Sequence, residues 1–136
     1  MKLVYFCIPA LLILMSFIVR NNTDCSKFKK GTFYYKGTED TTLYKVERGD
    51  SIQKETMVRT GDYVTLRLSW ANECEYDLAF ISQHIYLTDS INTQYQGLVL
   101  KTKIVRTEKD SAFLESYFVQ DPNQTKIRGV LYKASR

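Results

Sequence analysis

Residues 63–80 read YVTLRLSWANECEYDLAF, and this stretch decides the fold class. In its first half the apolar side chains of Val64, Leu66, Leu68 and Trp70 alternate with polar ones. A period of two is typical of a strand that buries one face. The alternation resumes after a short polar interruption, so the stretch predicts an antiparallel hairpin at the centre of the core.

The second half of this hairpin supplies the other inward-facing side chains. Its apolar set is Cys74, Tyr76, Leu78 and Phe80, and acidic residues alternate with them. Trp70, Tyr76 and Phe80 are the residues that we expect either to fill the core or to line a pocket. The two roles differ in consequence, because an apolar cavity above about 300 Å³ is large enough to hold a small molecule.

The rest of the chain continues this pattern. Ten tyrosines and seven phenylalanines, with many β-branched residues, favour pleated strands. Turn residues recur at intervals of about 8 to 12 residues, as in all-β domains. The predicted strands cover 31–36, 43–47, 51–58, 63–70, 75–81, 99–107, 112–119 and 126–133. Between them, the segment 82–98 is long enough for a crossover, and we expect a short helix at 90–96.

Tight turns connect most of the predicted strands. The pairs Gly49-Asp50 and Gly61-Asp62 supply the backbone conformations that reversals need. Strands joined by such turns pair antiparallel. We therefore predict an all-β antiparallel meander of about eight strands that forms a strongly bent sheet or a small barrel. It would be a single domain over 31–136, preceded by a linker at 21–30.

The N-terminal segment 3–19 is uncharged and almost wholly apolar, with Lys2 before it and Arg20 after it. This layout is that of a secretory signal, yet no good pair of small residues marks a cleavage site. As a helix it would be about 26 Å long, slightly shorter than a bilayer core of about 30 Å. Residues 1–20 are therefore a signal peptide or a membrane anchor. Both alternatives predict an apolar N-terminal helix and an exported protein of the periplasm, cell envelope or extracellular space.

Two cysteines, Cys25 and Cys74, follow the leader. In an oxidising compartment such an even pair is a candidate disulfide. The bond would close a loop of about 50 residues and stabilise the fold by about 4 kcal/mol in the chain-entropy model. The alternative is a pair of buried thiols that pack as small apolar groups.

No catalytic or metal-binding motif is present in the sequence. His84 is the single histidine, which argues against a zinc site. Glu73, Glu75 and Asp77 lie on one side of a strand, without the glycine turn of a calcium loop, and are typical of a solvated face. The chain also has no nucleophile elbow and no phosphate-binding glycine loop. We predict no enzymatic activity, no metal and no cofactor.

The charge of the chain indicates no polyanionic partner. Of the 19 Lys and Arg residues, Lys2 and Arg20 belong to the leader, and 15 acidic residues nearly balance the others. The cluster Lys27, Lys29 and Lys30 is too short for a nucleic-acid patch. We therefore expect no nucleic-acid partner.

Two segments resemble a group of small exported proteins from Bacteroidetes bacteria that has no established function. They are 25–33, CSKFKKGTF, and 70–78, WANECEYDL, and a third short segment, 58–60, VRT, belongs to the same resemblance. The matching positions are Cys25, Gly31, Phe33, Trp70, Cys74, Glu75, Tyr76 and Leu78. The resemblance covers 25–80 and implies an exported sheet protein. Some members carry an automatic topoisomerase IV label, but this chain is too short for one and has no ATP-binding module.

A second resemblance is to lipocalins, whose barrels hold one small apolar ligand. Short antiparallel strands after a Gly-x-Phe entry at 31–33 support it, although lipocalins have Trp where this chain has Phe33. Two functions follow from the whole sequence. The protein is a non-catalytic binding or interaction module of the cell envelope with an unknown protein partner, or a lipocalin-like carrier of a small apolar ligand. Membrane contact would come through 3–19 if the leader stays attached.

Overall fold

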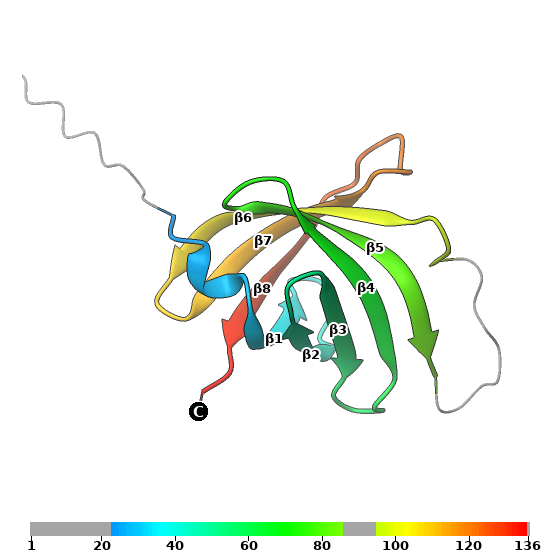
Figure 1. Ribbon diagram of the computed structural model, residues 1–136, viewed down its shortest axis with the longest axis horizontal. Coiled ribbons are helices and arrows are strands. Elements are labelled where there is room, and N and C mark those ends of the chain that lie inside the picture. Colours follow the sequence, from blue (N-terminus) through cyan, green and yellow to red (C-terminus); the bar gives the residue numbers. More distant parts are fainter. Residues whose placement is uncertain (1–22, 86–94, 136) are drawn as a thin grey trace, which may run out of the picture.

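The computed structural model describes residues 23–85 and 95–135. Within them, eight antiparallel strands form a closed barrel in which each strand pairs with its sequence neighbours and β1 also pairs with β8 (Figure 1). The strands are β1 (Gly31–Gly37), β2 (Leu43–Arg48), β3 (Ile52–Met57), β4 (Tyr63–Trp70), β5 (Glu75–His84), β6 (Val99–Glu108), β7 (Ser111–Phe118) and β8 (Ile127–Lys133). The predicted all-β meander is confirmed, and it closes as a barrel.

Two predictions fall outside the described residues. The apolar leader, predicted as a signal peptide or anchor, lies before residue 23, and 90–94 of the predicted short helix lies in the internal gap. Within 23–85 and 95–135, no helix has the length and apolar character needed to cross a bilayer.

Strand β5 extends beyond the predicted 75–81 and contains a β-bulge. Thr65 of β4 faces Ser82, whereas the next residue, Leu66, faces Phe80. Ile81 is therefore the extra residue in β5, and its side chain is exposed on the outside of the barrel. Such a bulge interrupts the simple alternation and bends the strand. For this reason, the alternation read from the sequence ends before β5 does.

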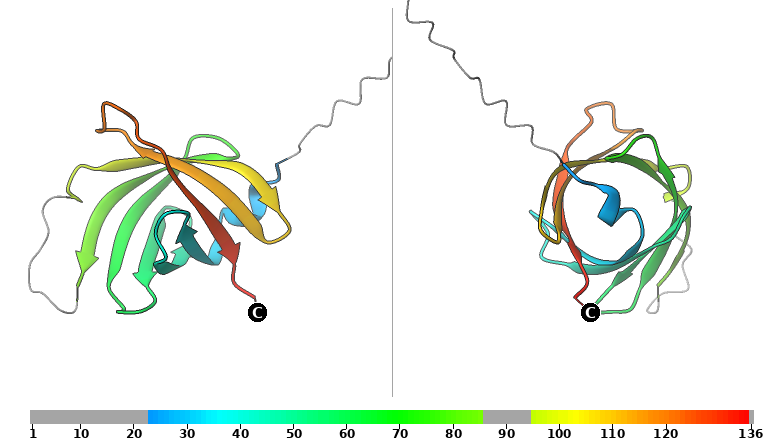
Figure 2. Two further views of the ribbon diagram at one scale, coloured as in Figure 1. Left: turned by 180° about the vertical axis from the view of Figure 1, so that it is seen from behind. Right: turned by 60° about the vertical axis from the view of Figure 1, so that its left-hand side comes forward.

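The two ends of the barrel differ. A short 3-10 helix, η1 (Ser26–Phe28), lies inside the barrel outline when the molecule is viewed along the barrel (Figure 2). The β2–β3, β4–β5 and β6–β7 turns lie at this end, which we call the closed end. The β1–β2, β3–β4, β5–β6 and β7–β8 connections lie at the other, which we call the open end.

η1 closes the barrel with residues that the sequence placed in a linker. Cys25 and Phe28 are 2% and 0% exposed, and Phe28 packs against Phe33 of β1 with ring centroids 5.9 Å apart. Residues three apart lie on the same side of a 3-10 turn, so both side chains can face the interior. Burying a phenylalanine contributes about 1.5–3 kcal/mol. The described part of the predicted linker is therefore a packed element, which we call the plug.

A disulfide joins the plug to the barrel wall. Cys25 is bonded to Cys74 in the β4–β5 turn, with the two Cα atoms 5.4 Å apart. The bond predicted from the sequence is thus present in the structure. It links two segments that are 49 residues apart in the sequence. The plug cannot leave the closed end while this bond is intact.

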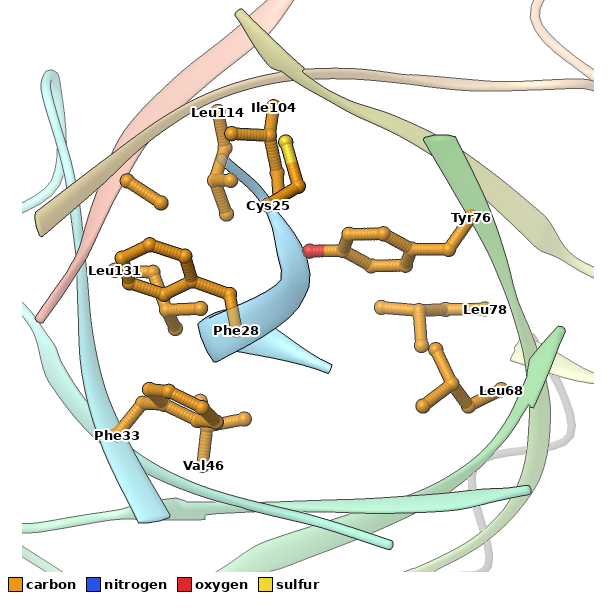
Figure 3. Close-up of a cluster of buried hydrophobic side chains, with 11 residues drawn as sticks. Cys25, Phe28, Phe33, Val46, Leu68, Tyr76, Leu78, Ile104, Leu114 and Leu131 are labelled. Carbon is orange, nitrogen blue, oxygen red and sulfur yellow. The ribbon is translucent and has the colours of Figure 1, made fainter. Parts of the chain in front are cut away.

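The buried side chains of the core surround η1 (Figure 3). Side chains from the plug, from β1 and from the β4–β5 hairpin meet there, and the Tyr76 hydroxyl points toward η1. The buried set is Cys25, Phe28, Phe33, Val46, Leu68, Tyr76, Leu78, Ile104, Ala112, Leu114 and Leu131. The predicted inward faces of β4 and β5 are confirmed by the burial of Leu68, Tyr76 and Leu78.

Candidate functional site

The open half of the barrel is hollow. A first cavity region of about 450 Å³ is lined from the β1–β2 and β7–β8 side of the open end. A second region of about 460 Å³ is lined from the β3–β4 and β5–β6 side. Tyr44, Glu55, Leu78 and Leu100 line both regions, so the two adjoin. We call the combined space the barrel cavity; its size suits a small molecule.

The cavity wall is mainly apolar and aromatic, because inward-facing positions alternate along each strand. The apolar and aromatic side chains of the wall are Tyr35, Tyr44, Val46, Met57, Tyr63, Val64, Leu66, Tyr76, Leu78, Phe80, Ile85, Tyr95, Leu98, Leu100, Leu114, Phe118, Ile127 and Leu131. The lining of the first region also contains two buried hydroxyl groups, on Thr102 and Ser116. Their oxygen atoms are 2.8 Å apart. One of the two hydroxyl groups donates to the other, and the Thr102 hydroxyl group also has a hydrogen bond with the Tyr76 side chain.

A glycine on β8 gives the Tyr35 ring its place in the wall. A Cβ atom at Gly129 would overlap the Tyr35 ring. Because Gly129 has no side chain, the Tyr35 ring can lie against the β8 backbone. In this position the ring lines the first cavity region.

A chain of buried polar side chains runs from the plug into the cavity. Arg48 donates from Nη1 to the Phe28 carbonyl oxygen at 2.8 Å and from Nε to Gln53 Oε1 at 2.6 Å. Gln53 Nε2 then donates to Glu55 Oε1 at 2.6 Å. Because Arg48 pairs with Gln53 and Val46 with Glu55 in the β2–β3 ladder, Glu55 lies nearer to the open end.

The guanidinium group of Arg48 is enclosed by aromatic rings. It lies 4.4 Å from the ring centroid of Tyr76, 5.6 Å from that of Trp70 and 5.7 Å from that of Phe33. Arg48 is 5% exposed. Desolvated contacts between a cation and a ring are worth about 2 kcal/mol. We infer that Arg48 mainly joins the plug to the barrel wall.

The three residues that we expected to fill the core or line a pocket, Trp70, Tyr76 and Phe80, occupy different positions. Trp70 packs on Tyr76, with ring centroids 4.7 Å apart, and lines neither cavity region. Tyr76 is 2% exposed and also forms part of the first region. Phe80 lines the second region. The set thus spans the boundary between core and cavity.

Glu55 is an acid held in a mainly apolar space. Burial raises the pKa of its carboxyl group, although the hydrogen bond from Gln53 and the charge of Arg48 act in the opposite direction. Burial, followed by the charge of Glu55, raises the pKa of Tyr35 to about 12. The ring hydroxyl of Tyr35 is therefore neutral at physiological pH. Acids with perturbed pKa values in cavities are concentrated at functional sites.

Gln83 of β5 presents an unused donor to the second region. Its Nε2 atom is buried and has no hydrogen-bond partner among the described residues. Val64 lies between Glu55 and Gln83 in the ladder, since it pairs with both. A buried donor without a partner costs about 1–3 kcal/mol. A bound molecule could remove this cost by supplying an acceptor.

Sequence reasoning missed Gln53 and Glu55. In β3 the inward face carries these two polar residues, whereas the apolar Ile52 is 43% exposed. An alternation of polar and charged residues gives no local signal for the face that turns inward. The adjacent strands β2 and β4 determine which face of β3 turns inward, because Glu55 pairs with Val46 on one side and with Val64 on the other.

His84 lies at the open end. Its ring stacks on that of Tyr63, with centroids 5.3 Å apart and an interplanar angle of 27°, and it lines the second region. Across 23–85 and 95–135, no group of three or more His, Cys, Asp and Glu side chains is arranged to hold a metal ion.

The acidic residues of β5 face away from the cavity. Glu75 pairs with Lys103, at 3.5 Å, and Asp77 pairs with Lys101, at 3.7 Å. All four side chains are at least one-third exposed. Exposed pairs of this kind contribute about 0–1 kcal/mol each. We interpret them as part of the solvated outer wall.

Comparisons with known proteins yield no relative. No protein-family model, no curated protein and no solved structure matches this chain. The resemblances to the Bacteroidetes group and to lipocalins therefore stay untested, and a functional proposal depends on the barrel cavity.

Proposed function

We propose that the protein binds a small, mainly apolar molecule inside the barrel cavity without chemically changing it. The single observation that carries this proposal is the combination of a plugged end with a hollow, aromatic open end. Of the two functions that the sequence left open, this favours the carrier.

The barrel wall around the cavity is held in a fixed arrangement, which suits a binding role. A closed ladder of strands and the Cys25–Cys74 bond hold the wall in place before a ligand arrives. A preorganised site binds more tightly, because less conformational freedom is lost on binding. The disulfide also supports the proposal of an exported protein, since disulfides persist in oxidising compartments.

A protein-interaction module is the second candidate. Exposed apolar side chains lie at strand ends and connections of the open end: Leu43, Val58, Tyr95, Val119 and Ile127. Exposed apolar groups at one end of a molecule are a feature of partner surfaces. The same groups would also border the entrance for a ligand.

Titration with the apolar fluorophore N-phenyl-1-naphthylamine tests the carrier proposal. We expect fluorescence to rise and saturate at one molecule per chain. Leu100→Trp places a large ring where the two cavity regions adjoin, and should weaken binding by about tenfold or more, equivalent to about 1.4 kcal/mol. Val105→Trp is the matched control, because Val105 is on the same strand and is exposed. Absence of saturable binding, or equal effects of both variants, would contradict the proposal.

A further inference from the structure

Glu55 places a carboxyl group where the two cavity regions adjoin. The other charged side chains each line one region: Glu39, Asp40, Arg48, Lys126 and Arg128 the first, and Asp62 the second. Among the described residues, Glu55 is the one charged side chain that lines both cavity regions. Its Oε1 atom accepts the hydrogen bond from Gln53, and within residues 23–85 and 95–135 no hydrogen bond or ion pair engages Oε2. The carboxylate is therefore placed to accept further hydrogen bonds from a molecule in either region.

The nearby positive charges already have partners, although the charge of Arg48 also lowers the pKa of Glu55 in part. Arg48 lies deeper than Glu55, bonded to Gln53 and the plug and covered by rings. Lys126 and Arg128 line the first region near its entrance, but both pair with Glu115 of β7, at 3.2 and 3.3 Å. In the β2–β3 ladder Glu55 lies nearer to the open end than Arg48 does. Of these two groups, the carboxylate is therefore the one placed toward a ligand in the open half.

Aromatic rings surround the same space. Tyr44, Tyr63, Phe80 and Tyr95 line the second region, and the rings of Phe80 and Tyr95 are 6.0 Å apart. The faces of such rings attract cations and also pack against an apolar body. A carboxylate among aromatic rings is chemically suited to an ammonium group attached to an apolar skeleton.

Gln83 adds a hydrogen-bond donor to this arrangement. Glu55 and Gln83 flank Val64 on three adjacent strands. Neighbouring strands are about 4.8 Å apart, so the backbones at these two positions are separated by about 10 Å. The unpartnered Gln83 Nε2 could donate to an oxygen of the molecule whose ammonium group pairs with Glu55.

We propose that the ligand is a small organic amine that binds as its cation, with its ammonium group on Glu55 and its apolar body against the aromatic wall. This inference rests on the proposed ligand-binding function. The attraction between the carboxylate and the cation offsets the free-energy cost of removing the carboxylate from water. The contacts are non-covalent, and no bond in the ligand is formed or broken.

Calorimetric titration of the intact protein with three molecules of equal chain length tests the proposal. Octylamine is a cation at neutral pH, 1-octanol is neutral and octanoate is an anion. We expect octylamine to bind about tenfold or more tightly than 1-octanol, as a charged hydrogen bond requires, and octanoate to bind most weakly. Equal or tighter binding of 1-octanol or octanoate would overturn the amine proposal but leave the ligand-binding function standing. If none of the three binds and N-phenyl-1-naphthylamine does not bind, the ligand-binding function fails as well.

Glu55→Gln provides the sharper test. The amide keeps the size of the side chain and an oxygen that can accept from Gln53, but it carries no charge. We expect octylamine affinity to fall by about tenfold or more, while 1-octanol affinity stays within about twofold. Glu47→Gln is the matched control, because Glu47 pairs with Lys45 on the outer face of β2. Unchanged octylamine affinity in a folded Glu55→Gln variant would overturn the proposal.

Discussion

The closed and open ends of the barrel use the same strands for opposite purposes. At the closed end, a disulfide through Cys25 holds the plug, and the Phe28 carbonyl oxygen accepts a hydrogen bond from Arg48. At the open end, the strands surround a cavity in which Glu55 is half-buried and Gln83 Nε2 has no hydrogen-bond partner within the described residues. Stabilising contacts are therefore concentrated at the closed end, whereas the open end carries a buried hydrogen-bond donor without a partner among the described residues. Binding sites commonly have lower stability than the rest of a fold.

Removing the plug ring should have the largest effect. Phe28→Ala is expected to lower the free energy of unfolding by about 3–5 kcal/mol, because it leaves a void in a fully buried site. Phe118→Ala is the comparison at the open end, where the ring already borders the cavity, and it should cost less. Urea denaturation of both variants measures the difference. Equal losses would show that the two ends contribute equally.

Loss of the disulfide should have the next largest effect on stability. The Cys25→Ser, Cys74→Ser double variant is expected to lose about 2–4 kcal/mol, because the unfolded chain is no longer cross-linked. Reduction of the wild-type protein should reproduce the loss, and reduction of the double variant should add nothing. Urea denaturation with and without reductant measures both. A double variant as stable as the oxidised wild type would show that the packing of Phe28 alone holds the plug.

Glu55→Gln should stabilise the unliganded protein at neutral pH. Burial raises the folded-state pKa of Glu55 above its ordinary value of 4.5. The folded state then holds the proton more tightly, so wild-type stability falls as pH rises from about 4.5 through the raised pKa. The amide variant lacks this loss. Urea midpoints across a pH series should therefore coincide below the ordinary pKa and separate in favour of the variant above it; parallel profiles would contradict this expectation.

Gln83→Met should give the smallest change, a gain of about 1 kcal/mol, because it removes a buried donor without a partner. The same change at Gln120 should destabilise the protein. Gln120 Nε2 donates to the Gly97 carbonyl oxygen at 2.7 Å, and its Oε1 accepts from the Val99 amide at 3.1 Å. Thermal denaturation of the two variants tests the contrast. A loss of stability in both would mean that Gln83 is satisfied in solution.

Local pattern predicted much of the fold but little of the site. The alternation through Leu66, Leu68 and Trp70 identified a strand and its inward face, because both depend on neighbouring residues in the chain. The site depends on Glu55, which looked like an ordinary polar position. Nothing in residues 52–57 themselves distinguishes the inward face from the outward one.

The sequence by itself determined the strands, the turns and the cysteine pair, since side-chain period, turn chemistry and cysteine count are local or compositional properties. Tertiary structure decided three things: the closure of β1 on β8, the packing of Phe28 as a plug, and the inward position of Glu55. Each of these depends on contacts between segments that are distant in the sequence or on the register between neighbouring strands. Such contacts form only when the whole barrel closes, and the cavity exists for the same reason.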